Sequence, residues 1–219
     1  MKKPKTSHKT LRYTTSMPKS KIGFFGGTFD PPHIGHLILA SEAAHQFGLT
    51  RLLWVLNPDP PHKQEMELTP LEHRLQMLKR AISDNPTFEL SRLEIDRPGP
   101  HFTINTIRYL IQHEPDAELF LLIGGDSLRD LPTWRFPSEI VAAVSKISVM
   151  RRPGDSFDMA ALESQIPGIT DKVSFIDALL LNLSSREIRR RVAAGDEYRY
   201  YVHPSVYEYI LANRLYREK

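Results

Sequence analysis

The chain has 219 residues with ordinary hydrophobic, aromatic and charged fractions, which suits one globular domain, with or without a small appendage, around a real core. It contains no cysteine, which excludes disulfides, Cys–zinc sites and thiol catalysis and fits a reducing cytoplasm. No apolar run approaches the length of a membrane span, so we expect a cytoplasmic protein with no membrane partner.

The net charge of +3 hides an uneven distribution of basic residues. Residues 1–20 hold six Lys and Arg and no acid, which leaves 23 basic against 26 acidic residues in the rest of the chain. This stretch has no apolar periodicity, and we expect it to be a disordered basic tail. Because the remainder is slightly acidic, nucleic acid is not an expected partner.

Beyond the tail, apolar strand-like runs alternate with helical patterns. The expected strands are 21–26, 51–56, 87–95, 118–123, 146–150 and 172–176. The expected helices are 34–47, 70–84, 104–112, 138–144, 184–194 and 204–215. Thr69, Pro70 and Glu72 predict a capping box at the start of the second helix.

Strands that alternate with helices predict an α/β fold with a doubly wound parallel sheet. We expect residues 21–183 to form this α/β core and residues 184–219 to form a small C-terminal helical part packed on it. Ligands of such sheets bind beyond the carboxyl ends of the strands.

The segment from Gly26 to His36 is the most informative part of the chain. It reads Gly-Gly-Thr-Phe-Asp-Pro-Pro-His-Ile-Gly-His and lies between the first strand and the first helix. Its glycines let the backbone turn sharply and approach a ligand closely. The following helix directs free N–H groups and the positive end of its dipole at the turn, which attracts phosphate. His33 and His36 stand at the helix mouth and can face the same anion.

This order of residues closely resembles the signature of the bacterial nicotinate mononucleotide adenylyltransferases, a family of the nucleotidyltransferase superfamily. Further segments are similar to motifs of that family, occur in the same order, and extend the resemblance from Lys21 to Tyr216. They are 57–63, 97–106, 124–134, 151–154 and 184–189. Three residues depart from the family pattern: His101 and Phe102 stand where Ser and Tyr are usual, and Arg186 replaces a threonine.

The resemblance implies a Rossmann-like, nucleotide-binding core and the transfer of the adenylyl group of ATP to nicotinate mononucleotide in NAD biosynthesis, giving deamido-NAD and pyrophosphate. The phosphate of the mononucleotide attacks the α-phosphorus of ATP in line, so catalysis consists of positioning and charge stabilisation. Mg²⁺ would be carried by the ATP phosphates.

The same resemblance implies the site residues. The catalytic residues would be His33, His36 and Arg189. ATP would be bound by Gly26, Gly27, Thr28, Phe29, His33, Gly35, His36, Gly124, Asp126, Ser184, Ser185 and Arg189. Nicotinate mononucleotide would be bound by Lys63, Thr103, Asp126 and Trp134.

Several alternatives stay open beside this interpretation. The acceptor could instead be nicotinamide mononucleotide or phosphopantetheine, or the chain could be a non-catalytic nucleotide-binding protein on the same fold. The string His-Ile-Gly-His also occurs in class I aminoacyl-tRNA synthetases, but their Lys-Met-Ser-Lys-Ser loop lies C-terminal to it, whereas the similar string at 16–20 precedes it.

Individual residues also have simpler explanations. A histidine of the first motif could have no role beyond capping its helix. Trp134 could have no role beyond packing in the core. A zinc site formed by His33, His36 and His62 would have no acidic ligand at a helical zinc spacing nearby. The sequence leaves self-association open.

Overall fold

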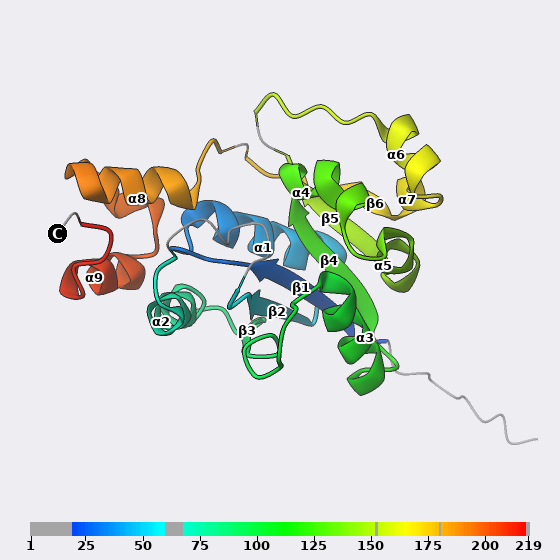
Figure 1. Ribbon diagram of the computed structural model, residues 1–219, viewed down its shortest axis with the longest axis horizontal. Helices are drawn as coiled ribbons and strands as arrows, with labels where there is room; N and C mark the ends of the chain where they lie inside the picture. The colour runs from blue at the N-terminus through cyan, green and yellow to red at the C-terminus, as the bar shows by residue number, and fades with distance from the viewer. Residues whose placement is uncertain (1–18, 60–67, 152, 180, 218–219) are drawn as a thin grey trace, which may run out of the picture.

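The computed structural model describes residues 19–59, 68–151, 153–179 and 181–217. These residues form a six-stranded parallel sheet with helices on both faces (Figure 1). The strands are β1 (Lys21–Gly27), β2 (Arg51–Leu56), β3 (Phe88–Ser91), β4 (Glu118–Gly124), β5 (Lys146–Met150) and β6 (Val173–Phe175). The expected α/β fold with a doubly wound parallel sheet is therefore confirmed.

The strand order is β3-β2-β1-β4-β5-β6, so the direction of winding reverses between β1 and β4. Both of these strands pair in parallel along most of their length, with Ile22 opposite Leu119 and Phe24 opposite Leu121. In a sheet of this kind the reversal opens a crevice beyond the carboxyl ends of the two central strands.

The helices between the strands have clear sequence causes. They are α1 (Ile34–Phe47), α2 (Leu71–Ala81), α3 (Thr103–His113), α4 (Gly125–Asp130), α5 (Pro137–Ala143), α6 (Met159–Gln165) and α7 (Ile169–Lys172). Helix α1 ends at Gly48, which adopts a left-handed conformation with φ of 61° that favours glycine. Helix α5 has a proline in its first turn, where a missing N–H costs nothing.

Strand residues alternate between two hydrophobic clusters, one on each face of the sheet. Leu52, Trp54 and Leu56 of β2 face the cluster that contains α1 and α2. Leu53 and Val55 face the cluster that contains α3, α4 and α5. Both faces of the sheet are thus covered, as a parallel sheet requires.

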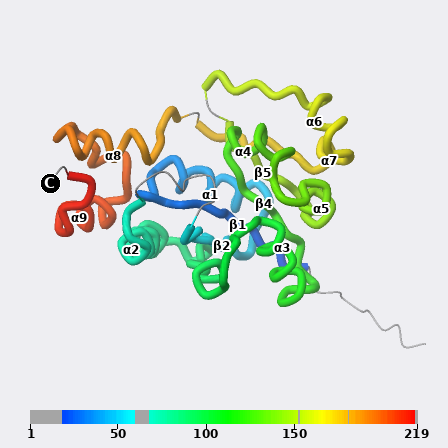
Figure 2. The backbone as a smooth tube through the Cα atoms, viewed as in Figure 1, coloured from blue at the N-terminus to red at the C-terminus, as the bar shows by residue number. Residues whose placement is uncertain are grey.

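The C-terminal part consists of α8 (Ser185–Ala194), a 3₁₀ turn (Arg199–Tyr201) and α9 (Pro204–Ala212). Its buried side chains, which include Ile188, Val206 and Ile210, belong to the same hydrophobic cluster as α1 and α2. Figure 2 shows α8 and α9 on the side of the molecule where α2 lies, and α9 packs directly against α2.

Some predicted boundaries are wrong. The third strand ends at Ser91, because the chain then turns so that the Asp96 N–H donates to the Arg92 carbonyl. The short helices α4, α6 and α7 were not expected, since four to seven residues carry little periodic signal. The predicted capping box at Thr69 is absent: Pro70 is the N-cap of α2, and no side chain caps that helix.

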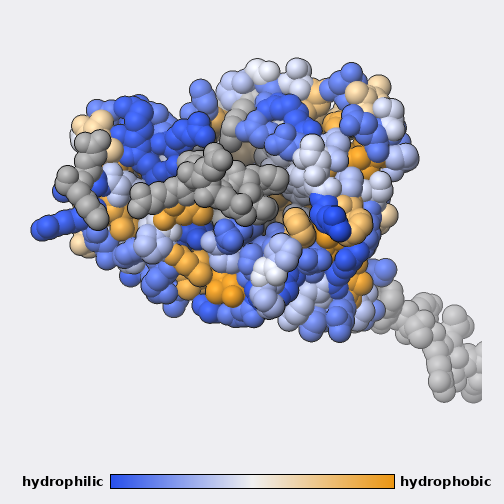
Figure 3. Space-filling model, viewed as in Figure 1, coloured by the Kyte–Doolittle hydropathy of each residue, from blue (hydrophilic) through white to orange (hydrophobic). Residues whose placement is uncertain are grey.

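In the part of the chain that the structure describes, no helix is long and apolar enough to cross a membrane. On the face seen in Figure 3, hydrophilic residues predominate and hydrophobic ones form only small patches. The predicted basic tail lies largely outside the described residues.

The shared core predicts how the C-terminal helices unfold. Ile210 of α9 is 1% exposed, whereas its neighbour Leu211 is 37% exposed. We expect Ile210→Ala to lower the free energy of unfolding by about 2–5 kcal/mol, because it leaves a cavity, and Leu211→Ala to change it far less. Urea unfolding followed by circular dichroism measures both. Loss of α9 in a separate early transition, with the remaining stability unchanged, would show that the C-terminal part is an independent unit.

Candidate active site

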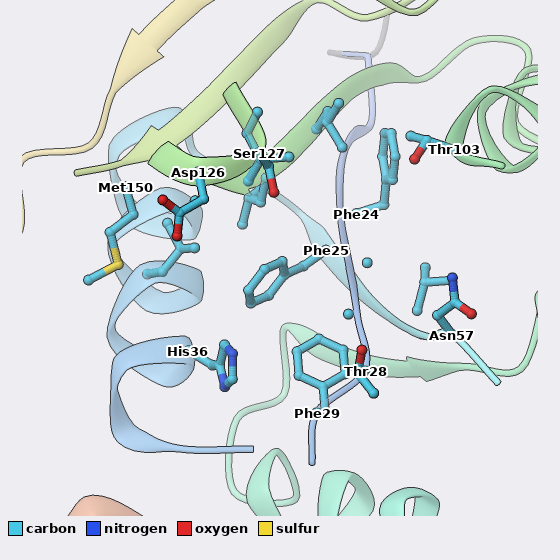
Figure 4. Close-up of a pocket in the computed structure, with 18 of the residues that line it drawn as sticks. Phe24, Phe25, Thr28, Phe29, His36, Asn57, Thr103, Asp126, Ser127 and Met150 are labelled. Carbon is cyan, nitrogen blue, oxygen red and sulfur yellow. The ribbon is translucent and has the colours of Figure 1, made fainter. Parts of the chain in front are cut away.

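A cavity of about 800 Å³ opens beyond the carboxyl ends of β1 and β4. Figure 4 shows side chains from several elements around it, with His36 reaching in from α1 and Asn57 and Thr103 on the opposite side. The sequence-predicted residues that line it are Gly26, Gly27, Thr28, Phe29, His33, Gly35, His36, Thr103, Gly124, Asp126, Trp134, Ser185 and Arg189. The fold thus brings together residues from both ends of the chain.

His33 and His36 hold each other through a reciprocal capping box at the start of α1. The His36 N–H donates to Nδ1 of His33 at 3.3 Å, and the His33 N–H donates to Nδ1 of His36 at 3.2 Å. The two rings stack with centroids 3.6 Å apart. Because each Nδ1 accepts a hydrogen bond, a neutral ring must carry its proton on Nε2. His33 is therefore a helix cap and a cavity residue at once.

The surroundings of the histidine pair come from β1 and from the rest of the motif. His36 lies 5.2 Å from the Phe29 ring and 5.8 Å from the Phe25 ring, measured between centroids. A Cβ placed on Gly35 would approach Nδ1 of His33 to 3.1 Å. Glycine at this position therefore leaves room for the His33 ring.

The C-terminal segment reaches the cavity across the motif loop. The Ser185 hydroxyl donates to the Pro31 carbonyl at 2.9 Å, and Nη1 of Arg189 donates to the Asp30 carbonyl at 2.7 Å. Ser184 accepts the Glu187 N–H at 3.2 Å and is the N-cap of α8. Its hydroxyl thus serves the helix, and Ser184 is not among the described residues that line the cavity.

The carboxyl end of β4 supplies an acidic corner. Asp126 lies in the first turn of α4 and accepts a hydrogen bond from Arg129, which also donates to Asp155 at 2.9 Å. A Cβ on Gly125 would meet a carboxylate oxygen of Asp155 and the ring of Phe157, so a larger residue here would force these side chains to move. Arg129, which is itself held by Asp155, thereby orients the Asp126 carboxylate.

The far end of the cavity is formed by the start of α3. Phe102 is the N-cap of this helix, no side chain caps it, and its first turn contains no acid. Thr106 donates to the buried Glu94 carboxylate at 2.6 Å. Burial raises the pKa of Glu94. Trp134 lines the cavity and also packs against the hydrophobic cluster that contains α3, so its two interpretations are compatible.

Sequence reasoning missed several lining residues, among them Glu94 and Asn57. The one available signal for Glu94 was an acid between the apolar residues Leu93 and Ile95. Lys63 and His62 lie outside the described residues. Within the residues that the structure describes, no group of three or more His, Asp or Glu side chains could hold a metal ion.

Comparison with known proteins places the chain in a family. The model of the cytidylyltransferase-like family matches residues 24–191. A probable nicotinate-nucleotide adenylyltransferase from Thermomicrobium roseum is 42% identical over 90% of this chain and 92% of its own length. The nicotinate-nucleotide adenylyltransferase of Bacillus subtilis is 39% identical over 90% of this chain and 98% of its own length. The chain belongs to the nicotinate-nucleotide adenylyltransferases.

Solved structures agree with the fold of this family. A nicotinic acid mononucleotide adenylyltransferase from Plasmodium falciparum, solved in complex with NaAD, superposes with a TM-score of 0.75. The match covers 90% of this chain and 97% of the other at 20% identity. At this identity the similarity concerns the fold alone.

The packing of Gly35 against His33 generates a prediction for the family motif. Gly35→Ala should reduce turnover by roughly tenfold or more, because the new methyl group displaces a ring whose placement must be accurate to well under 1 Å. The melting temperature should change little, since the added atom meets only that ring. Steady-state pyrophosphate release and thermal unfolding of the same samples test this. Full activity in the alanine variant would contradict the role given to Gly35.

Proposed function

We propose that this protein transfers the adenylyl group of ATP to nicotinate mononucleotide, forming the deamido dinucleotide and releasing pyrophosphate. The observation that carries the proposal is the convergence of helix starts on the cavity. Helices α1, α3 and α8, of 14, 11 and 10 residues, all have residues of their first turn in its lining. Their N–H groups and positive dipole ends favour ligands with several negative charges.

In the proposed reaction, a phosphate oxygen of the mononucleotide forms a bond to the α-phosphorus of ATP while the bond from that phosphorus to the pyrophosphate oxygen breaks. The nucleophile is already an anion, so no proton must be removed from it. His33 and His36 would donate from Nε2 to the oxygens on which charge develops. Donors that are oriented in advance stabilise such charge without reorganisation.

Arg189 would contact the departing pyrophosphate, and so would Ser185 through its backbone N–H at the start of α8, since the Ser185 hydroxyl donates to Pro31. One guanidinium nitrogen of Arg189 is used on the Asp30 carbonyl, which leaves the planar group anchored with further N–H donors. Gly26, Gly27 and Thr28 would let the phosphates approach the backbone, and Asp126, beyond Gly124, would accept from ribose hydroxyls. Phe29 and Gly35 would shape the pocket around the histidines.

The nicotinate group would lie at the start of α3. The uncapped N-terminus of this helix and the hydroxyl of Thr103 can both donate to a carboxylate. Trp134 would stack on the pyridine ring or line its pocket, and Lys63 would hold the phosphate of the mononucleotide. The donors at the start of α3 thus favour a carboxylate over a neutral substituent on the pyridine ring.

Mg²⁺ would enter with the ATP phosphates and neutralise part of their charge. The described residues offer no cage of three or more carboxylates or histidines, so the ion would take its remaining ligands mainly from water, as Mg²⁺ commonly does. A cytoplasmic location stays a prediction.

The tautomer of the histidines gives a mutational test. His36→Asn keeps an acceptor near the position of Nδ1 and so preserves the cap, but it removes the Nε2 donor. We expect turnover to fall by about 10²–10³, as for the loss of one charge-stabilising donor. His36→Gln, whose amide N–H reaches toward the place of Nε2, should keep more activity than His36→Asn. Equal activity of wild type and His36→Asn would exclude His36 from catalysis.

The choice of acceptor gives a second test. The carboxylate of the nicotinate group only accepts hydrogen bonds, so the N–H groups of α3 and the hydroxyl of Thr103 can all donate to it. The NH₂ of a nicotinamide group is itself a donor and cannot accept from them. Leaving one or two such groups unpaired lowers kcat/KM for nicotinamide mononucleotide by roughly 10² relative to the nicotinate compound. The assay compares the two acceptors at fixed ATP and Mg²⁺. Preference for nicotinamide mononucleotide would contradict the proposed acceptor but not the proposed adenylyl transfer. If neither acceptor led to pyrophosphate release, both the acceptor and the reaction would be contradicted.

A further inference from the structure

Two buried charged residues stand at the motif loop beside the cavity: Asp30 is among its lining residues, whereas Arg74 is not. Arg74 of α2 is 2% exposed and Asp30 of the motif loop is 3% exposed. Withdrawing charges from water is costly unless hydrogen bonds satisfy them, so the partners of these two groups indicate what they are for. Burial lowers the pKa of the Arg74 guanidinium, and the Asp30 charge opposes this shift.

Arg74 connects three separate loops through backbone carbonyls. Its Nε donates to Thr69 at 2.9 Å, and Nη1 donates to Thr28 at 3.2 Å and to Asn57 at 2.8 Å. Nη2 donates to Pro58 at 2.8 Å. One guanidinium therefore joins the carboxyl ends of β1 and β2 to the start of α2. It also holds the chain on both sides of the segment that contains Lys63.

Asp30 receives donors from two distant parts of the chain. The Tyr216 hydroxyl donates to one carboxylate oxygen at 2.7 Å, and the Thr69 N–H donates to the other at 3.2 Å. Burial, with the Asp30 charge beside it, raises the pKa of Tyr216, so the phenol remains a donor. The carbonyl of Asp30 is the group to which Arg189 is anchored.

We propose that Arg74 and Tyr216 are positioning residues for adenylyl transfer. Neither is among the described residues that line the cavity. Arg74 fixes the loop at Thr28, and Tyr216 fixes it at Asp30. That loop leads directly into His33 and carries the carbonyl that orients Arg189. The inference rests on the roles proposed above for the histidines and Arg189.

The mechanism of this effect is geometric. In-line transfer needs its donors placed to within a fraction of an ångström, and a misplacement of 1 Å costs about 10²-fold in rate. A lysine at position 74 offers a point charge in place of a planar fork and cannot span the three loops. A phenylalanine at position 216 keeps the ring but leaves the Asp30 carboxylate short of a donor.

Tyr216→Phe is the primary test, with Tyr209→Phe as its matched control. Tyr209 lies on α9, and its hydroxyl contacts Nδ1 of His73 at 2.9 Å, away from Asp30. We expect Tyr216→Phe to lower kcat about tenfold while KM for ATP stays within about threefold, since the binding groups remain and only their placement loosens. Tyr209→Phe should leave kcat unchanged. An unchanged kcat in Tyr216→Phe, or an equal fall in both variants, would overturn the proposal.

A double-mutant cycle separates positioning from general stability. Because Tyr216 acts through Asp30 on Arg189, the loss in Tyr216→Phe with Arg189→Lys should be smaller than the product of the single losses. Multiplicative losses would contradict the proposal. Arg74→Lys, compared with Arg80→Lys on the same helix, gives a second measurement: the first should lower kcat and the second should not. If Arg74→Lys fails to fold, the tyrosine cycle decides.

These variants distinguish a failure of the proposed function from a failure of the positioning roles of Arg74 and Tyr216. If wild type is inactive, or Arg189→Lys matches wild type, the proposed function or its residue roles fail. If wild type is active and Arg189→Lys is impaired while Tyr216→Phe is normal, only the positioning inference fails.

Discussion

The site depends on one interaction, the pair of hydrogen bonds by which His33 and His36 cap each other's backbone. Each ring uses Nδ1 for the other's N–H, and this fixes both the orientation of the rings and the nitrogen that carries the proton. The usual helix cap is a short polar side chain with no further task. Here the caps are the groups proposed to stabilise the transition state, so the start of α1 cannot loosen without disturbing the chemistry.

The doubly wound sheet supplies the location for this pair. The reversal of strand order between β1 and β4 leaves a crevice at their carboxyl ends, where the chain repeatedly passes from strand to helix. The passages that follow β1, β3 and β4 bring the starts of α1, α3 and α4 to the same cavity. The C-terminal helices add one more, because α8 crosses back over the motif loop and anchors Arg189 on Asp30. Backbone geometry thus adds positive potential to that of the Arg189 side chain.

The central strands and most of the longer helices could be predicted from the sequence because their apolar periods are long enough to read. The first motif could be placed because its strand, glycine turn and helix are contiguous. Arg74 and Tyr216 could not be predicted, since their partners lie on loops far away in the sequence and a basic residue in an amphipathic helix normally reaches solvent. Glu94 could not be predicted for a related reason: its burial at the end of a cavity results from tertiary packing, which leaves no local pattern in the sequence. From the sequence, a helix cap and a cavity residue are alternatives for the motif histidine, and the structure shows that His33 both caps α1 and lines the cavity.

The most direct test of this account is the tautomeric state of the two histidines, measured by nitrogen NMR of the protein labelled at histidine, with assignments from His33→Gln and His36→Gln. The account predicts that both rings are neutral Nε2–H tautomers in the free enzyme, with Nδ1 unprotonated. It further predicts that binding of a non-hydrolysable ATP analogue shifts the Nε2 signals far more than those of Nδ1. Protonation at Nδ1 in either ring of the free enzyme would contradict the reciprocal cap and, with it, the arrangement from which the proposed catalysis is derived.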